Sequence, residues 1–406
     1  MRIAIRIFLV GFLACCLDQA GDFLAKGVRA QDCADAGAQA VARMPRAEPE
    51  QVGFDADRLR RVDAVIEQGL EEKKMPGCVF GVARRGKLVW LKAYGHRQWE
   101  PTPVPMTTDT LFDLASITKP VATACSVMLL VERGKLGLDD KVTRYLPEFA
   151  AEGKEAITIR DLLLHVSGLL PDNALADYEQ GPEESFRRIC ALKLQAPTGE
   201  RFIYSDVNFI VLGEIVRKAS GRDLQAFTRE NFFAPLGMRH TGFVPDEALR
   251  EFAAPTEQRE GRWMRGEVHD PRAYKLGGIA GHAGLFSTAE DLAVFAQMLL
   301  DEGAYDEQRI LAADTIATMT RGYPVPKASR GLGWDKRSGY SSNRGAGLSD
   351  RAFGHGGFTG TVLWIDPELD LFYVFLSNRV HPRGKGLINP LAGQLGTIVV
   401  ESLRDR

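Results

Sequence analysis

Several patterns that would point to particular protein classes are scarce or missing in this chain. Only six of its 406 residues are cysteine, and no two form a C-x-x-C pair, so neither a cysteine-ligated metal site nor a disulfide framework is indicated. The three cysteines within the expected folded region, Cys78, Cys125 and Cys190, are predicted to be small buried hydrophobes. No H-E-x-x-H and no G-x-x-x-x-G-K-[ST] occurs, which speaks against a zinc hydrolase and a phosphate-cradling loop.

Neither positive nor negative charge predominates in the chain. The 51 Lys and Arg residues nearly balance the 53 Asp and Glu residues, for a net charge of −2, and no long basic run occurs. Nucleic acid and acidic polymers are therefore not expected as partners. The size allows one large globular unit or two interlocked domains. We expect a monomer that acts on a small molecule or peptide.

The first residues resemble an export signal. Arg2 and Arg6 precede an apolar run over residues 7–17, which is shorter than the roughly 18 to 20 residues that span a bilayer and fits a secretory signal. Val28-Arg29-Ala30 offers a small-x-Ala cleavage site, whereas Leu13-Ala14-Cys15 resembles a bacterial lipoprotein box. The expected location is therefore outside the cytoplasm, either periplasmic or as a membrane-anchored lipoprotein.

Both ends of the folded region carry strand patterns. Apolar residues at three- and four-residue steps predict a helix over 55–75, followed by strands at 78–83 and 88–93. Two further strands, 360–365 and 371–376, flank a turn and precede a last helix over 390–403. The fold class is therefore α/β (α+β), with one antiparallel sheet built from both chain ends, flanked by helices, and a mostly helical insertion.

The middle of the chain, about 140 to 300, is predicted to be mostly helix and loop. Thr158 and Asp161 form a capping-box pattern, with Gly168 expected to close the helix. Ser287-Thr288-Ala289-Glu290 is a second cap pattern, whereas residues 321–350 are predicted to be loop. The resulting domain assignment is a signal at 1–30, a linker at 31–50, a sheet domain made of 51–115 and 270–406, and a helical domain at 116–269.

A hydroxyl and an amine lie one helical turn apart in Ser116-Ile117-Thr118-Lys119, directly before an apolar run. Residues at i and i+3 share a helix face, so a neutral lysine there can take the proton that makes a serine nucleophilic. Two further motifs follow in chain order, Tyr204-Ser205-Asp206 and His355-Gly356-Gly357.

In order and spacing these three motifs resemble those of the serine β-lactamase and penicillin-binding protein superfamily on its class C side, which are S-x-x-K, Y-x-N and K-T-G or H-T-G. The resemblance runs from about residue 50 to the C-terminus. Segments such as Leu164 to Leu169, Gly281 to Thr288 and Ser377-Asn378-Arg379 further resemble the branch with D-Ala-D-Ala carboxypeptidases and β-lactamase-like esterases.

The resemblance implies a β-lactamase/transpeptidase-like fold and an acyl-enzyme mechanism without metal or cofactor. Ser116 is the expected nucleophile, and Lys119, if burial depresses its pKa, shares the roles of base and acid with Tyr204. The expected oxyanion donors are the backbone N–H groups of Ser116 and, by resemblance, Phe358. Gly356 and Gly357 are expected to let a substrate backbone approach the strand.

Two residues depart from the family pattern. Asp206 stands where Asn is usual, and an ionised Asp accepts hydrogen bonds but cannot donate them; it should also favour a charged Lys119. His355 replaces a lysine that helps to hold a substrate carboxylate in class C β-lactamases, and a neutral imidazole donates only one hydrogen bond. We hypothesise that Arg379 supplies the missing positive charge.

Structural alternatives exist for these residues. Ser116 can be a helix cap and Lys119 a surface charge. Tyr204 can be a core aromatic residue whose hydroxyl is satisfied, and Asp206 can cap a helix that begins near Val207. His282, between glycines, is predicted to hold a loop and not to act in catalysis.

The sequence thus predicts a serine hydrolase of D-Ala-D-Ala carboxypeptidase-like or carboxylesterase-like activity, with a true β-lactamase as the alternative. A slow-turnover protein that senses β-lactams or cell-wall fragments is an alternative of another class.

Overall fold

The computed structural model describes residues 43–384 and 386–405. The predicted signal and cleavage sites, with Cys15, Cys16 and Cys33, lie outside the described residues. Cys78, Cys125 and Cys190 are buried and free, which confirms their prediction as small buried hydrophobes. The segment Ala115–Glu132 is long and apolar enough to cross a membrane, but 83% of it is buried inside the fold, as in the core helix of a folded domain.

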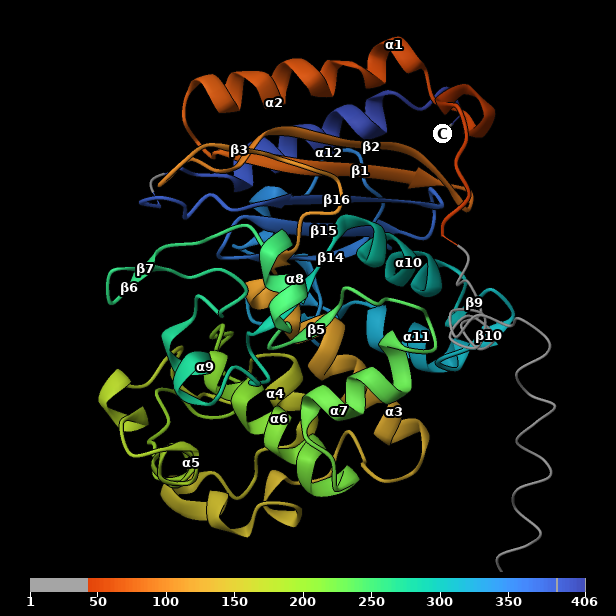
Figure 1. The fold of residues 1–406 in the computed structure, drawn as a ribbon. Helices are drawn as coiled ribbons and strands as arrows, with labels where there is room; N and C mark the ends of the chain where they lie inside the picture. The colour runs from red at the N-terminus through yellow and green to blue at the C-terminus, as the bar shows by residue number, and fades with distance from the viewer. Residues whose placement is uncertain (1–42, 385, 406) are drawn as a thin grey trace, which may run out of the picture. The chain divides into compact units, whose positions relative to one another are not determined.

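One large antiparallel sheet organises the described residues, and its strands come from both ends of the chain (Figure 1). Strand β1 (Gly77–Arg84) pairs with β2 (Lys87–Gln98) on one side and with β16 (Leu371–Ser377) on the other. The order continues through β15 (Thr361–Asp366) to β14 (Phe353–Gly357). The predicted fold class is therefore confirmed.

The sheet extends beyond β14 into a segment that the sequence predicted to be loop. Strands β11 (Tyr323–Val325), β12 (Ala328–Arg330) and β13 (Asp335–Arg337) continue it in that order to its edge. The loop prediction for 321–350 was wrong at these three strands, because strands of three residues are too short to show a two-residue alternation. Their pairing with the existing sheet edge, and not their own pattern, makes them strands.

Helices cover both faces of this sheet. Helices α2 (Arg61–Glu71) and α12 (Asn389–Glu401) pack together over one face, and α10 (Ala289–Leu300) contacts β16 and β1 on the other (Figure 1). The predicted helix over 55–75 is split into α1 (Ala56–Leu59) and α2, which ends at Glu71.

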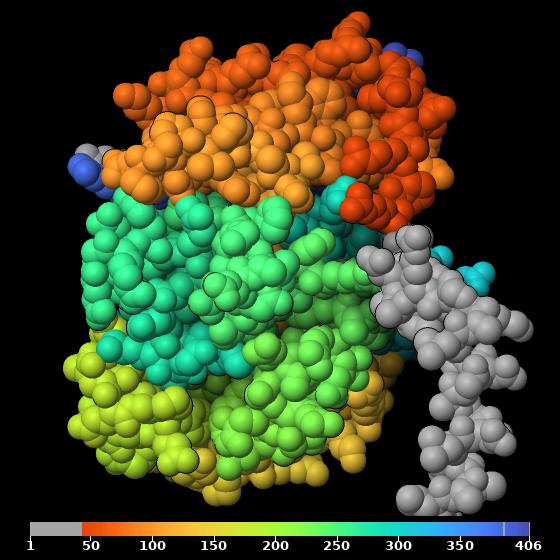
Figure 2. Space-filling view, in the orientation of Figure 1, coloured from red at the N-terminus to blue at the C-terminus, as the bar shows by residue number. Residues whose placement is uncertain are grey.

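The helical part carries two of the predicted caps. Thr158 and Asp161 form a capping box at α4 (Ile159–Leu163), and the Thr288 side chain accepts the Asp291 N–H at the start of α10. Gly168 does not close α4, because this helix ends at Leu163. In the space-filling view the orange β2 region and the green segments of the insertion lie directly against each other (Figure 2).

The other elements are short and connect these layers. The helices are α3 (Cys125–Glu132), α5 (Pro182–Cys190), α6 (Asp206–Ser220), α7 (Leu224–Thr228), α8 (Glu247–Phe252), α9 (Pro271–Lys275) and α11 (Ala313–Thr320). The strands are β3 (Val104–Pro105), β4 (Phe112–Asp113), β5 (Gly242–Phe243), β6 (Gln258–Arg259), β7 (Arg262–Trp263), β8 (Leu285–Ser287), β9 (Ala304–Tyr305) and β10 (Gln308–Arg309).

Candidate active site

Ser116 lies in a tight 3-10 turn, Ala115–Ile117, which continues into a π-helical segment, Lys119–Ala124, and then into α3. Ala115 adopts a positive φ of 46°, which is strained for a residue with a Cβ. Its N–H donates to the Asp113 carboxylate at 2.8 Å. This backbone conformation is held by the hydrogen bond to Asp113. It turns the Ser116 side chain toward a cavity and places Lys119 behind Ser116.

Lys119 is a buried polar side chain beside Ser116. Its side chain is fully buried, and Nζ donates to Ser116 Oγ at 2.9 Å and to the His282 carbonyl oxygen at 3.2 Å. Nζ also forms an ion pair with Asp206 Oδ1 at 2.6 Å. The predicted Ser–Lys pair is thus present, with a carboxylate as a third member.

These surroundings set the charge of Lys119. Burial by itself lowers its pKa, but the Asp206 carboxylate and the Tyr204 phenol favour the ammonium form, and the net pKa lies above the ordinary lysine value. The condition under which Lys119 could act as a neutral base, a pKa depressed by burial, is therefore not met. The expectation that Asp206 favours a charged lysine agrees with this direction.

Asp206 does not cap the helix that follows it. Ser205 is the N-cap of α6, and its hydroxyl accepts the Asn208 N–H at 3.2 Å, whereas Asp206 is the first helical residue. This frees the Asp206 carboxylate to turn toward Lys119. The capping alternative was wrong, and the ion pair places Asp206 within the site.

Tyr204 reaches the same cavity as Ser116 and is half-buried. Its ring packs between those of His165, at a centroid distance of 4.6 Å, and Tyr340, at 4.8 Å. Lys119 Nζ lies 5.0 Å from the Tyr204 ring centroid. An aromatic residue held on both faces and close to a buried ammonium is positioned for chemistry and not merely for packing.

Strand β14 approaches the nucleophile segment closely enough to require glycine. A Cβ on Gly357 would lie 2.3 Å from the Leu114 carbonyl oxygen and 2.2 Å from Thr361 Oγ1. A side chain at this position would therefore push β14 away from Ser116. Phe358, whose N–H is the predicted second oxyanion donor, follows directly and is 61% exposed at the cavity rim.

His355 is neutral in this setting. Burial, followed by the nearby charges of Arg330 and Lys119, holds its pKa well below the ordinary histidine value. Its Nδ1 lies 2.8 Å from the Gly356 carbonyl oxygen, which assigns the ring proton to Nδ1 and leaves Nε2 as an acceptor. The one ring N–H of His355, which was expected to donate to a substrate carboxylate, therefore donates to the Gly356 carbonyl oxygen.

Arg379 lines the cavity wall, where its guanidinium stacks over the Phe358 ring at 4.6 Å. Its Nε donates to the Phe358 carbonyl oxygen at 2.8 Å, and Nη1 donates to the Gly386 carbonyl oxygen at 3.1 Å. These bonds fix the loop that carries Phe358. A carboxylate-binding role for Arg379 stays a prediction.

A cavity of about 460 Å³ brings the predicted residues together. Its lining includes Ser116, Tyr204, His355, Gly356, Gly357, Phe358 and Arg379, and it also includes Arg330, Tyr340 and Asn343, which no motif indicated. Lys119 and Asp206 lie behind Ser116. Sequence reasoning missed the additional residues because they lie in the segment that was predicted to be loop.

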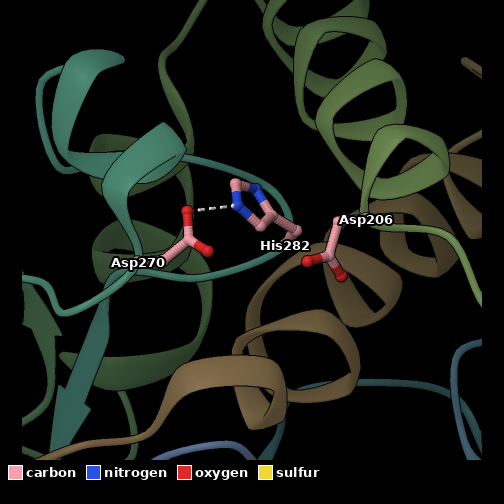
Figure 3. Close-up of side chains that lie close together, drawn as sticks. All are labelled: Asp206, Asp270 and His282. Carbon is pink, nitrogen blue, oxygen red and sulfur yellow. Dashed lines mark hydrogen bonds and ion pairs between the residues drawn. The ribbon is translucent and has the colours of Figure 1, made fainter. Parts of the chain in front are cut away.

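His282 combines a structural side chain with a carbonyl group that contacts the site. Its Nε2 lies 2.9 Å from Asp270 Oδ1, which also accepts two N–H groups at the start of α9 (Figure 3). The His282 carbonyl oxygen accepts a hydrogen bond from Lys119. The loop-holding role agrees with this geometry, but the loop positions Lys119 directly.

Asp206, Asp270 and His282 place one ligand atom each within 4.8 Å of one another (Figure 3). Each carboxylate already has a partner, since Asp206 pairs with Lys119 and Asp270 with His282. A divalent cation would have to displace or repel the Lys119 ammonium at 2.6 Å from Asp206. We therefore assign these groups to holding Lys119 and not to a metal.

With this geometry in place, comparison with known proteins identifies the family. The family model described as "Beta-lactamase" matches residues 62–396. The chain belongs to the beta-lactamase family. It is 34% identical over 377 residues to an N-acetylmuramyl-L-alanine amidase of Bacillus subtilis, covering 82% of this chain and 83% of that protein. A putative D-alanyl-D-alanine carboxypeptidase of Escherichia coli is 34% identical over 372 residues, covering 82% and 85%.

Solved structures show the same fold. A penicillin-binding protein homologue from Caulobacter crescentus superimposes with a TM-score of 0.71 at 24% identity, over 86% of this chain and 99% of that one. The family match identifies this chain as a serine hydrolase that acts through an acyl-enzyme on a small acyl substrate.

Proposed function

We propose that Ser116 attacks the acyl carbonyl of the substrate, forms an ester with it, and releases the leaving group before water completes the hydrolysis. The observation that carries this proposal is the contact of Ser116 Oγ with the buried Lys119 ammonium at the wall of the cavity. An ammonium at 2.9 Å favours negative charge that develops on Oγ during attack.

A charged Lys119 has no lone pair for the serine proton, so another group accepts it first. Tyr204 is the best candidate, because it lines the same cavity as Ser116 and its ring centroid lies 5.0 Å from Lys119 Nζ. When the tetrahedral intermediate of the first step collapses, the neutral phenol gives this proton to the leaving group. In the second step the resulting phenolate takes a proton from the attacking water and then returns it to Ser116 Oγ as the ester is cleaved. Lys119 then acts as a fixed positive charge and Asp206 as its counter-ion.

The backbone N–H groups of Ser116 and Phe358 are the proposed oxyanion donors. Loss of one such donor in other acyl-transfer enzymes costs about 2.7 to 4 kcal/mol of transition-state stabilisation. The close approach of Gly357 to Leu114 sets the distance between the segments that carry these two donors. Their spacing therefore depends on glycine at this one strand position.

The favoured substrates are peptides or amides derived from the bacterial cell wall. This choice rests on the named activities of the relatives, an N-acetylmuramyl-L-alanine amidase and putative D-alanyl-D-alanine carboxypeptidases. The apparent export signal at residues 1–30 is consistent with such a substrate. Hydrolysis of β-lactams is less favoured, because the only ring proton of His355 is committed to Gly356.

Turnover assays on three substrate types test this proposal. The purified protein is incubated with a peptide ending in D-Ala-D-Ala, a p-nitrophenyl ester and a penicillin, while protein mass and product are followed. Release of D-Ala or of p-nitrophenol, lost in Ser116→Ala, supports the hydrolase. Full activity of Ser116→Ala would refute the mechanism, and a persistent penicilloyl adduct without any turnover would favour the sensor alternative.

A further inference from the structure

The Tyr204 ring lies between one buried neighbour and one exposed neighbour. On one face is His165, whose side chain is fully buried and packs against Phe209 at a centroid distance of 5.1 Å. His165 Nδ1 also accepts the Ser205 N–H at 3.0 Å. This face of Tyr204 is therefore fixed by the core and by the backbone of the residue that follows it.

The other face of Tyr204 is covered by Tyr340, which is 53% exposed and lines the same cavity. The two rings lie at a centroid distance of 4.8 Å with an interplanar angle of 36°, and Tyr340 also contacts Phe202 at 6.3 Å and 74°. Rings at such separations attract each other. Because half of its surface faces solvent, Tyr340 adds little to the core, but its contact limits the movement of the Tyr204 ring.

The turn that carries Tyr340 is fastened to the sheet by serine hydroxyl groups. The Ser338 N–H donates to Ser341 Oγ at 2.8 Å, and the Tyr340 N–H donates to Ser338 Oγ at 3.1 Å. Ser341 Oγ in turn donates to Asp335 Oδ2 on strand β13 at 2.7 Å. The position of Tyr340 therefore depends on the hydrogen bond between Ser341 and Asp335.

Asp335 is itself fixed by a buried ion pair. The Arg330 side chain is fully buried, and its Nη1 lies 2.8 Å from Asp335 Oδ1. Strands β12 and β13 have three residues each, and β13 pairs with β14 only where Asp335 lies opposite Gly354. Backbone pairing alone thus holds this hairpin at few points. A buried ion pair adds little net stability but can favour one arrangement over others, and here it fixes the strand to which the Tyr340 turn is bonded.

We propose that Tyr340 is a positioning residue for Tyr204. The buried ion pair and the serine hydroxyl keep its turn in place, and its ring keeps the Tyr204 hydroxyl in one position relative to Ser116. The inference rests on the proposed function, in which Tyr204 moves protons in both steps of the reaction. Tyr340 itself transfers no proton, so its ring is required and its hydroxyl is not. A displacement of about 1 Å in a catalytic group can lower a rate about a hundredfold.

Variants of Tyr340 separate ring packing from chemistry by its hydroxyl group. With the p-nitrophenyl ester or D-Ala-D-Ala peptide that the wild-type protein hydrolyses, Tyr340→Ala should lower the turnover number about tenfold or more, with less change in KM. Tyr340→Phe should recover most of the wild-type value. Formation and hydrolysis of the acyl-enzyme, followed by protein mass, should both slow in Tyr340→Ala. Phe252→Ala is the matched control, because Phe252 is 45% exposed and lies outside the cavity lining.

Two double-variant cycles test whether Tyr340 acts through Tyr204. In a Tyr204→Phe background, which lacks the phenol hydroxyl, Tyr340→Ala should slow acyl-enzyme formation by no more than about twofold. Ser341→Ala removes the hydrogen bond to Asp335 and should lower the turnover number by itself, but it should add nothing to Tyr340→Ala. This second cycle keeps Tyr204 intact, so it decides the question if Tyr204→Phe forms no acyl-enzyme.

A normal turnover number in Tyr340→Ala would overturn the proposal. An equal loss in Tyr340→Phe would assign the effect to the hydroxyl group and overturn it as well. The same holds for a loss that persists in full in the Tyr204→Phe background or, without an acyl-enzyme there, for additive losses in the Ser341 cycle. Thermal unfolding verifies that each variant folds, and Ser341→Ala carries the test if Tyr340→Ala does not. Failure of the proposed function is seen separately, as turnover that survives Ser116→Ala.

Discussion

Replacement of Asp206 by Asn tests whether Lys119 is a permanent cation. The substitution keeps the shape of the side chain but removes the charge 2.6 Å from a fully buried ammonium. Removal of one partner from a buried ion pair costs about 3 to 5 kcal/mol. Because the Asp206 side chain is 20% exposed, we expect a value near the lower end, about 3 kcal/mol.

The pH dependence of this loss gives a second, independent check. In the wild-type protein the pKa of Lys119 is raised, so its contribution to stability is present below the unfolded lysine pKa of about 10.4 and is lost only above it. In Asp206→Asn the burial effect is no longer opposed by this carboxylate, and the folded-state pKa falls below the unfolded value. The variant then gains stability as pH rises, so its deficit relative to wild type should shrink between pH 7 and pH 9.5.

Thermal and urea unfolding at both pH values measure these differences. A loss of about 3 kcal/mol corresponds to a melting temperature lower by roughly 6 °C, at about 2 °C per kcal/mol for a large domain. In a Lys119→Met background, where no ammonium needs a counter-ion, Asp206→Asn should cost much less. Equal stability of wild type and Asp206→Asn at pH 7, with no pH-dependent difference, would show that Lys119 is not charged in the folded protein.

Three further outcomes follow from individual contacts. His282→Gln, which can keep the hydrogen bond to Asp270, should retain most of the turnover number, whereas His282→Ala should lower it with little change in KM; equal loss in both would refute a positioning role. Gly357→Ala should abolish turnover by forcing β14 away from the Leu114 carbonyl, and a normal rate would contradict the close approach. His355→Gln should remove no ionisation near the ordinary histidine pKa of about 6.5 from the kcat/KM profile, because burial holds the pKa of His355 well below that value; loss of a limb there would show that the imidazole titrates.

The strong local patterns of the sequence were sufficient for much of the fold. The strands that became β1, β2, β15 and β16 each contain an apolar run of four or more residues, and the turns between them are marked by Gly, Pro and Asp. The capping box at Thr158 was found for the same reason, since its two side chains are only three residues apart. Short-range spacing makes such features visible in the chain itself.

Errors occurred where long-range contacts decide the structure. The three-residue strands between 321 and 350 form only because β14 offers an edge. Asp206 had a plausible local role as a cap, but Ser205 took that role and left the carboxylate for Lys119. The sequence left open whether burial or the Asp206 carboxylate sets the pKa of Lys119, because the answer depends on their separation, which is 2.6 Å in the folded protein.

The sequence by itself determined the family, the sheet assembled from both chain ends, and the identity of Ser116, Lys119 and Tyr204 as candidates, because motif order and apolar periodicity are properties of the chain. Only the tertiary structure decided that Lys119 is charged, that the one ring proton of His355 is donated to the Gly356 carbonyl oxygen, and that Arg330 lines the cavity. Electrostatic interaction and hydrogen bonding depend on distances between residues far apart in sequence, and these distances exist only once the chain has folded.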